Sequence, residues 1–351
     1  MKISVLALLV VVTAVSGCGS DEVSIPASMK VSALESPSAQ KNGPAEKAFS
    51  VLAAGAKGGS TGAASFAVYS LVPPNAPADH LAARQAALNI APQGSVRKNA
   101  LMNSSTVETG NWSLTTDDVS EGEVFVDNTR NHLGSSVAEA NLATDDRYIT
   151  VGRDHAKKMF GQAFTSMSPY AYKVRKYFNA HSNGQATQVD GVYQVAVAFN
   201  STIDGVPVIG PGGKVSVDMT TDGSVVRHEG SLRHTRGRLH LIRQQQDLVT
   251  PDAAEAAVNA RLDARGIDRT LYRVARREFG YFMHGRRSIQ TVLVPHYGFF
   301  LEPLPGTMGK TLVEIEPATD DPSVLALIAA DAKAETARKA ALMANTDQRA
   351  H

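Results

Sequence analysis

Basic side chains recur at every second residue of one short stretch, "LRHTRGRLHLIR", residues 232–243. In a β-strand, successive side chains point to opposite faces. One face would then carry His234, Arg236, Arg238 and His240. Because a guanidinium is a planar donor fork that fits carboxylate and phosphate, we interpret this Arg/His stripe as a candidate binding face for an acidic protein surface, an anionic polysaccharide or lipid headgroups. The alternative is a solvated strand face that keeps a sheet edge soluble.

The stripe belongs to a segment that is locally rich in arginine. Residues 226–287 contain 13 arginines against seven acidic residues, and no lysine occurs between Lys214 and Lys310. The whole chain of 351 residues carries a formal charge of only +1. Its overall field therefore indicates neither a nucleic-acid partner nor an acidic tail.

The stretch "HEGSLRH" comes nearest to a zinc motif. Zinc proteases hold their metal with two histidines four residues apart on one helical face. Here His228 and His234 are six residues apart in a strand-like context, where their side chains would lie about 20 Å apart. We therefore predict no metal site, and we interpret these residues as turn or surface histidines.

No catalytic arrangement is evident in the rest of the chain. The sequence has one cysteine and no G-x-S-x-G elbow. "GPGGK", residues 210–214, lacks the spacing and the following Ser/Thr of a phosphate-binding loop, so a hairpin loop is its simpler interpretation. We predict that the protein is not an enzyme and needs no cofactor.

The N-terminus has the features of a secreted lipoprotein. A basic start, Met1-Lys2, precedes an apolar run at 3–15 that is too short to span a membrane comfortably. The next residues, "VSGC", resemble a bacterial lipobox, whose cysteine becomes acylated. The resemblance implies cleavage before Cys18 and a lipid anchor that holds the mature chain outside the cytoplasm. Cys18 is then the lipidated first residue of the mature protein.

Composition and hydrophobic periodicity divide the chain into segments. Residues 19–64 are rich in Ser, Ala, Gly, Pro and Lys, which is typical of a flexible linker. The expected organisation is a signal peptide at 1–17, a tether at 18–64, a small α+β unit at 65–145, a helix-plus-sheet module at 146–245, a second such module at 246–320, and a C-terminal helix and tail at 321–351.

We predict an α+β fold in which one helix followed by an antiparallel meander occurs twice. The first helix is expected at 150–164 and the second at 250–265. Thr250-Pro251-Asp252 supplies an N-cap, a first-turn proline and an acidic residue suited to the helix dipole. The expected strands are 65–72, 106–115, 121–129, 171–179, 191–200, 213–220, 224–242, 271–280, 288–295, 297–302 and 310–316.

Residues 204–226, "DGVPVIGPGGKVSVDMTTDGSVV", are typical of a β-hairpin with a turn signal at each end. Asp204-Gly205 and Asp222-Gly223 are strong turn signals because such turns need positive φ. Pro207 has no N–H to donate, so it belongs at a strand start or on an edge. Gly210 opens the expected hairpin loop.

These residues resemble the propeptide segment of thermolysin- and fungalysin-type metalloproteases. The family pattern of a strand, a "dG-[IV]-P-V-x-G" turn, a second strand and a "dG" turn corresponds here to Asp204, Gly205, Val206, Pro207, Val208, Gly210, Asp222 and Gly223. The unit beginning with "LVTPDAAEAAVNARL" is similar to the cystatin-like PepSY modules that often accompany it. The resemblance implies cystatin-like modules at 146–245 and 246–320, and a role in restraining or chaperoning a peptidase. No H-E-x-x-H motif follows in this chain, so any such role would act in trans.

The sequence thus predicts a lipid-anchored protein of the bacterial cell envelope that binds a partner protein without catalysis. A secreted peptidase is the partner that the resemblance favours. The alternative is a structural or carrier lipoprotein that binds an anionic envelope component through the Arg/His stripe. The residue after Cys18 is glycine rather than aspartate, which favours the outer membrane if the organism has one.

Overall fold

The computed structural model describes residues 66–347 apart from a few short stretches. The undescribed stretches are 74–76, 91–94, 100–101, 121, 131–135, 183–186 and 243–247, and side chains are not described at 179–182, 187–190, 240–242 and 345–347. The expected signal peptide, Cys18 and the expected tether lie outside the described residues. No helix in the described part of the chain is long and apolar enough to cross a bilayer.

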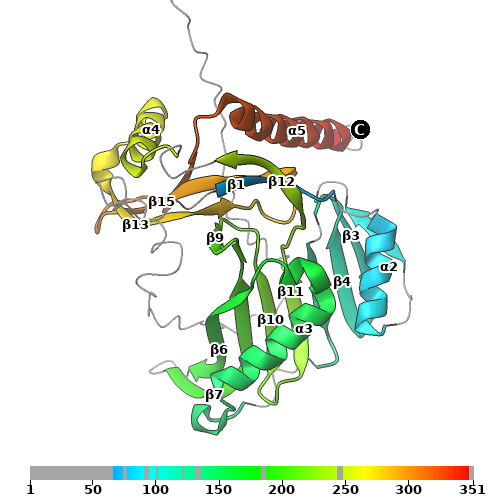
Figure 1. Cartoon of the computed structure of the whole chain (residues 1–351). Helices are drawn as coiled ribbons and strands as arrows, with labels where there is room; N and C mark the ends of the chain where they lie inside the picture. Colours follow the sequence, from blue (N-terminus) through cyan, green and yellow to red (C-terminus); the bar gives the residue numbers. More distant parts are fainter. Residues whose placement is uncertain are drawn as a thin grey trace, which may run out of the picture.

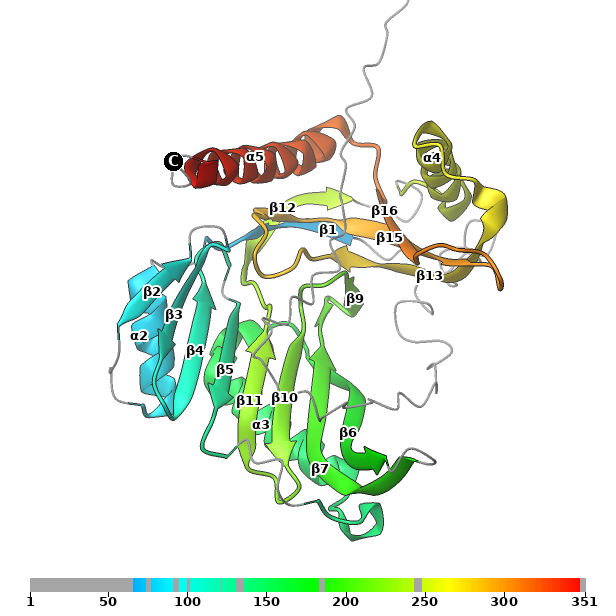
Figure 2. The same ribbon diagram turned by 180° about the vertical axis from the view of Figure 1, so that it is seen from behind.

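Eight strands form the larger sheet, and every pair of adjacent strands in it is antiparallel. In spatial order they are β2 (Val96–Asn99), β3 (Ser104–Glu108), β4 (Trp112–Asp117), β5 (Glu123–Asp127), β11 (Val225–Gly230), β10 (Val215–Thr220), β7 (Thr187–Asn200) and β6 (Tyr170–Ser182). Helices α2 (Pro77–Leu88) and α3 (Asp145–Thr165) cover one face (Figure 1). Seen from behind, the sheet lies in front of both helices (Figure 2).

Two smaller sheets form a second layer above the larger one. The first has the order β12 (Thr235–Ile242), β1 (Phe66–Leu71) and β14 (Val292–Leu293). The second has the order β16 (Leu312–Pro317), β15 (Pro295–Pro303), β13 (Tyr272–Phe282), β9 (Val206–Ile209) and β8 (Thr202–Ile203). Helices α4 (Pro251–Ala264) and α5 (Pro322–Asp347) lie on the outer side of this layer (Figures 1 and 2).

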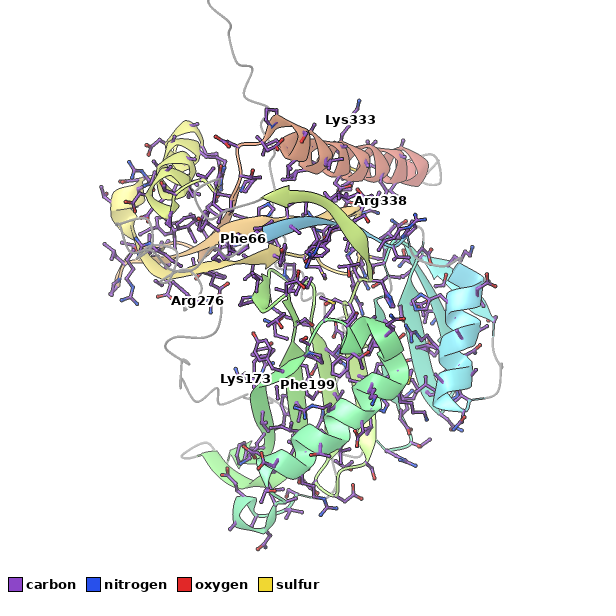
Figure 3. All side chains as sticks on the ribbon, in the orientation of Figure 1. Phe66, Lys173, Phe199, Arg276, Lys333 and Arg338 are labelled. Carbon is purple, nitrogen blue, oxygen red and sulfur yellow. The ribbon has the colours of Figure 1, made fainter. Side chains whose placement is uncertain are left out.

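The apolar core has two main parts, one in each layer. Phe160 and Phe164 of α3 pack against Phe199 and its neighbours in the larger sheet. Phe66 of β1 packs against Phe279 of β13 in the upper layer, beneath α4. Figure 3 marks Phe66 and Phe199 in their separate layers. The lower cluster also contains residues of β1 and β14, so the two layers share buried contacts.

Helix α5 is attached to the upper layer by carboxylates that accept main-chain N–H groups. Asp331 accepts from the N–H of Thr291 at 2.9 Å, and Glu335 accepts from the N–H of Ile289 at 3.1 Å. Arg338, labelled in Figure 3, donates to the carbonyl of Arg287 at 3.3 Å. The loop before β14 is therefore hydrogen-bonded to α5, the last helix in the described part of the chain.

The expected α+β class is confirmed, and several local signals are confirmed with it. The Thr250 side chain caps α4 by accepting from the N–H of Ala253 at 3.2 Å, with Pro251 in the first turn. Gly266 follows the helix with φ +70°, as a C-terminal glycine should. The C-terminal helix is α5.

The strands pair differently from the expected linear grouping. The run 224–242 is two strands, and β11 and β12 belong to different sheets. Strand β5 pairs with β11, so the division expected at residue 145 runs through one sheet. Strand β1 does not join the strands that follow it but pairs with β12 and β14.

The expected hairpin at 204–226 is wrong in its pairing, although both turns exist. Asp204 and Gly205 have positive φ and connect β8 to β9, and Gly223 has φ +94° between β10 and β11. However, β9 pairs in parallel with β13, whereas β10 lies between β7 and β11. The chain changes layers at 210–213, where a Cβ on Gly212 would lie 2.2 Å from the carbonyl oxygen of His284.

Replacing Gly230 by alanine is expected to lower the free energy of unfolding by about 1–3 kcal/mol. The added Cβ would lie 2.1 Å from Cζ of the buried Phe160 ring, so the ring or strand β11 must shift. Urea unfolding measures the loss. Gly237→Ala on β12 is the matched control, because its Cβ would meet nothing within 4 Å. Equal losses in the two variants would contradict the packing argument.

Candidate functional site

The Arg/His stripe lies on and next to β12, at the edge of the three-stranded sheet. Among the described strands, β12 pairs only with β1. Arg236 and Arg238 are exposed. His234 precedes the strand, is half-buried, and its carbonyl accepts from the N–H of Val72 at 2.8 Å. His240 is paired with Val68 through the main chain, and its side chain lies outside the described residues.

The simple alternation expected for the stripe is wrong because the strand is irregular. The β1–β12 register shifts twice, which leaves Arg236 and Leu239 without a paired residue on β1. Each shift breaks the period of two. Leu239, which strict alternation would place on the face opposite the stripe, is 53% exposed beside Arg238.

Arg236 differs from the other arginines of the segment 226–287. Each of the other described arginines contacts a carboxylate or a main-chain carbonyl. Arg236 makes no ion pair with a described residue, and Arg243 lies outside them. The local excess of positive charge is thus largely used within the fold, and Arg236 on β12 remains available.

A hollow of about 570 Å³ lies between α5 and the three-stranded sheet, over residues of β12, β1 and β14, and we name it the β12 groove. Its lining includes Leu71, Arg236, Gly237, Arg238, Leu239 and Leu327. A Cβ on Gly237 would meet nothing within 4 Å, so the space above the strand is open. The groove combines apolar side chains with Arg236 and Arg238, and it adjoins β12, which has an unpaired edge among the described strands. Together these features suit an extended segment of another chain.

The structure brings one residue of each sequence-based candidate set together. Arg238 donates to Oδ2 of Asp204 at 2.6 Å, and the Tyr69 hydroxyl donates to the same oxygen. The Tyr69 hydrogen bond, with the Arg238 bond and charge, lowers the pKa of Asp204 although partial burial opposes this. The β8–β9 turn is thereby linked to the stripe on β12.

The other residues of the hairpin motif lie elsewhere and serve the fold. Gly205 completes the β8–β9 turn, and Pro207 lies in β9 beside the two-residue edge strand β8. Gly210 has φ +90° and approaches Phe282 too closely for any side chain. Asp222 accepts from the N–H of Ser224 at 2.9 Å, next to Gly223 in the β10–β11 turn.

A buried network of charged and imidazole groups lies beneath the helices, and sequence analysis missed it. Glu123 of β5 is fully buried. Its Oε1 lies 2.7 Å from Nε2 of His228, and its Oε2 lies 2.6 Å from Nε of Arg84. Nδ1 of His228 lies 2.9 Å from Nε2 of His155 on α3. We call these residues, with His80 on α2, the Glu123 network.

The environment of the Glu123 network fixes its protonation. Burial alone would raise the pKa of Glu123, but the hydrogen bond with His228, the neighbouring His80 and the positive charge of Arg84 lower it to about 2. Burial, with the charges of His228 and Lys158, lowers the pKa of His155 to about 3. Glu123 is therefore an anion and His155 a neutral imidazole at neutral pH.

The interpretation of His228 as a turn or surface histidine is wrong. It lies in β11, between β5 and β10, and its ring stacks on Phe125 with centroids 5.5 Å apart. Val226, His228 and Gly230 occupy every second position of β11 and are all buried. This alternation with Val226 is the local signal that could have indicated a buried His228. The partners of its side chain come from two distant segments, β5 and α3, so spacing alone could not identify them.

A second buried carboxylate holds the loop before β14. Asp117 at the end of β4 lies 3.5 Å from Nε of Arg286 and 3.8 Å from Nε of Arg287. Burial raises the pKa of Asp117 to about 6, although these arginines oppose the rise. Arg233 donates to the carbonyls of Val119 and Gly285 at 3.3 and 3.1 Å. These arginines connect the two layers.

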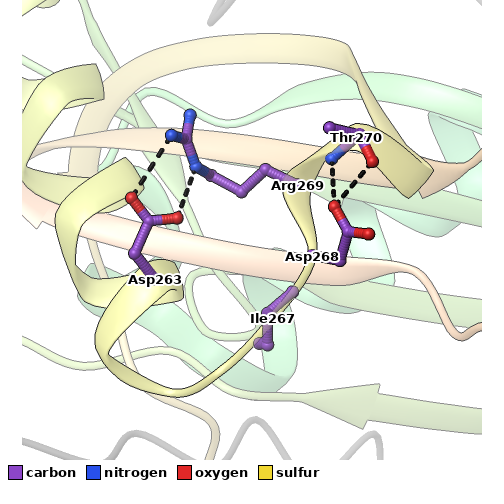
Figure 4. A pocket seen from close by; sticks show the side chains of 5 residues that line it. All are labelled: Asp263, Ile267, Asp268, Arg269 and Thr270. Carbon is purple, nitrogen blue, oxygen red and sulfur yellow. Dashed lines mark hydrogen bonds and ion pairs between the residues drawn. The ribbon is translucent and has the colours of Figure 1, made fainter.

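A shallow depression at the end of α4, shown in Figure 4, uses its polar groups locally. Arg269 Nε lies 2.7 Å from Asp263 Oδ1, and Asp268 accepts from the N–H of Thr270 at 2.9 Å. Ile267 supplies the apolar contact of its lining. Across the described residues, no group of three or more His, Cys, Asp or Glu is placed to hold a metal ion.

Comparison with known proteins found only distant structural similarity. No family model matches the chain, and no curated protein matches it. A solved structure of an uncharacterized protein from Eubacterium rectale is 8% identical, and the match covers 73% of this chain and 85% of that chain with a TM-score of 0.43. A likeness at this level carries no argument about fold or function.

His155→Gln is expected to weaken the pH dependence of stability in acid. Because folding lowers the pKa of His155 to about 3, the unfolded chain binds its proton first as the pH falls. Its contribution to stability is therefore complete above about pH 6.5 and is lost as the pH falls toward 3. Urea unfolding at several pH values should show a slope smaller by about one proton in the variant.

Asp117 also changes stability with pH, in the opposite direction to His155. Comparing wild type with His155→Gln cancels the contribution of Asp117, because both proteins contain it. Its raised pKa means that Asp117 adds stability as the pH falls through about 6, in wild type and variant alike. Parallel curves for the two proteins would show that His155 is not held neutral in the fold.

Proposed function

We propose that this chain is an extracytoplasmic lipoprotein of the bacterial cell envelope, anchored through Cys18, whose folded part binds a partner protein and catalyses no reaction. The N-terminal basic start, apolar run and lipobox-like "VSGC" support the anchor. The outer membrane is the proposed location if the organism has one.

The β12 groove is the observation that carries the binding function. A strand with one unpaired edge offers main-chain N–H and C=O groups to an incoming extended segment. The apolar part of the groove supplies contacts that exclude water, and Arg236 has no ion-pair partner among the described residues. These features suit a protein segment that adds to the edge of β12.

The partner class that we propose is a secreted peptidase, which this protein restrains or chaperones in trans. Support comes from the resemblance of 191–226 to protease propeptides. We propose as well that α3 with β6, β7 and β10 and α4 with β13, β15 and β16 are two cystatin-like repeats. In both, one helix precedes antiparallel strands and packs on them, which supports this relationship.

The second candidate is a structural or carrier lipoprotein that binds an anionic envelope component. The exposed Arg236 and Arg238 favour it, because an anionic polymer needs only accessible positive charge. Salt distinguishes the two candidates, since screening acts strongly on exposed charges and weakly on main-chain pairing and apolar contacts.

A crosslinking pull-down with the full chain in its native envelope tests the proposal. We expect a secreted peptidase to be recovered at low salt. At about 0.5 M salt, recovery of the same peptidase should be weaker but not lost. The purified complex should then show reduced peptidase activity. Recovery of anionic polymer alone, and only at low salt, would instead support the carrier function.

Gly237→Ile is expected to reduce recovery of the partner roughly tenfold, which corresponds to about 1.4 kcal/mol of binding free energy. The new side chain suits a strand and enters the open space above Gly237, where it narrows the β12 groove. Gly110→Ile, in the β3–β4 turn and also in open space, is the control. If both variants recover the partner equally well, the groove is not the contact.

A further inference from the structure

We propose that the β12 groove binds an acidic extended peptide segment. When no segment is bound, Asp204 holds Arg238 and takes the place of one carboxylate of the segment. The inference rests on the proposed binding function and specifies the chemistry of the segment. It combines the lining of the groove with the contacts of the β8–β9 turn.

The lining of the groove requires both charge and apolar surface in its ligand. Arg236 and Arg238 lie in it with the exposed Leu239 of β12 and Leu327 of α5. Guanidinium groups select carboxylates, whereas the leucines gain free energy by contacting apolar side chains. A peptide that alternates acidic and apolar residues supplies both, and an anionic polysaccharide supplies only the charge.

The irregularity of β12 places the two kinds of residue at the groove. The register shifts leave Arg236 and Leu239 unpaired on either side of Gly237 and Arg238, and all four line the groove. Bulges redirect side chains at sheet edges. The strand edge therefore presents a cation and an apolar side chain to the same open space.

Asp204 identifies carboxylate as the group that Arg238 accommodates. Its Oδ2 accepts from Arg238 at 2.6 Å and from the hydroxyl of Tyr69. The Arg238 and Asp204 side chains are 57% and 50% exposed, and ion pairs so exposed contribute little free energy. A carboxylate from a ligand can therefore replace Asp204 at small cost, while Tyr69 keeps its hydrogen bond to Asp204.

The other Asp-Gly turn of the chain provides a matched comparison. Asp222 accepts from Thr220 and from the N–H of Ser224 within its own turn, and it makes no ion pair with a described residue. Both aspartates precede a glycine in a turn, but Asp222 bonds within its own turn, whereas Asp204 contacts a groove arginine. Removing each carboxylate separates competition for Arg238 from a general effect on turns.

Fluorescence anisotropy with the full-length protein in detergent micelles tests the proposal. The probe is a labelled peptide of alternating glutamate and valine, with polygalacturonate as the polymer probe. Asp204→Asn is expected to tighten peptide binding about two- to fivefold, because Arg238 loses its internal competitor. Asp222→Asn should leave it unchanged, and Arg236→Ser should weaken it.

The fold of the variants is verified by their urea midpoints. Asparagine tolerates the positive φ of residue 204, and Asp204→Gly removes the carboxylate at a position where glycine is also favoured. The expected result is that both Asp204 variants bind the peptide more tightly than wild type, whereas Asp222→Asn binds it as wild type does.

Two results would overturn the inference, and they differ in what they imply for the proposed function. If the peptide binds wild type and Asp204→Asn equally, Asp204 is no substitute for a ligand carboxylate, yet protein binding by the groove stands. If polygalacturonate binds and the peptide does not, the ligand is a polymer and the carrier function replaces the peptide. Recovery of a peptidase in the pull-down decides the proposed function separately.

Discussion

The ionised carboxylate of Glu123 determines how the larger sheet and its helices fit together. A fully buried anion is stable only with close, well-aligned partners, because it has lost its hydration. Glu123 forms a hydrogen bond with His228 of β11 and an ion pair with Arg84 of α2, and His228 in turn contacts His155 of α3. The Glu123 network thus joins four elements that are far apart in sequence. Phe160 also lies against His228, so the apolar packing and the ionic contacts depend on each other.

Local signals predicted individual elements well, and they failed where distant segments meet. Thr250 and Pro251 fixed the start of α4, and Asp204-Gly205 fixed a turn, because capping and positive φ depend on neighbouring residues. The same residues could not indicate that β9 would pair with β13 rather than with β10. Strand pairing over such separations is decided by packing between layers, which periodicity does not report.

The candidate site was partly predictable for the same reason. Arg236 and Arg238 were found from their alternation, and both are exposed on β12. The contact between Arg238 and Asp204 could not be predicted, because it depends on a turn of another sheet that lies beside β12. The register shifts in β12 also had no sequence signal that we could use. Most arginines of the segment 226–287 make ion pairs within the chain, many of them at its surface, and composition alone could not distinguish these from arginines available for binding.

The position of β1 has a consequence for the order of folding. Its residues come first among the described elements, yet it is the central strand between β12 and β14. Phe66 is paired with Ile242 and Ser70 with Val292, so both neighbours are synthesised long after it. A chain that emerges from its N-terminus therefore carries the apolar segment "FAVYSL" without partners until most of the protein has followed. While the rest of the chain is being synthesised, this exposed apolar segment would be a natural contact for a holding chaperone.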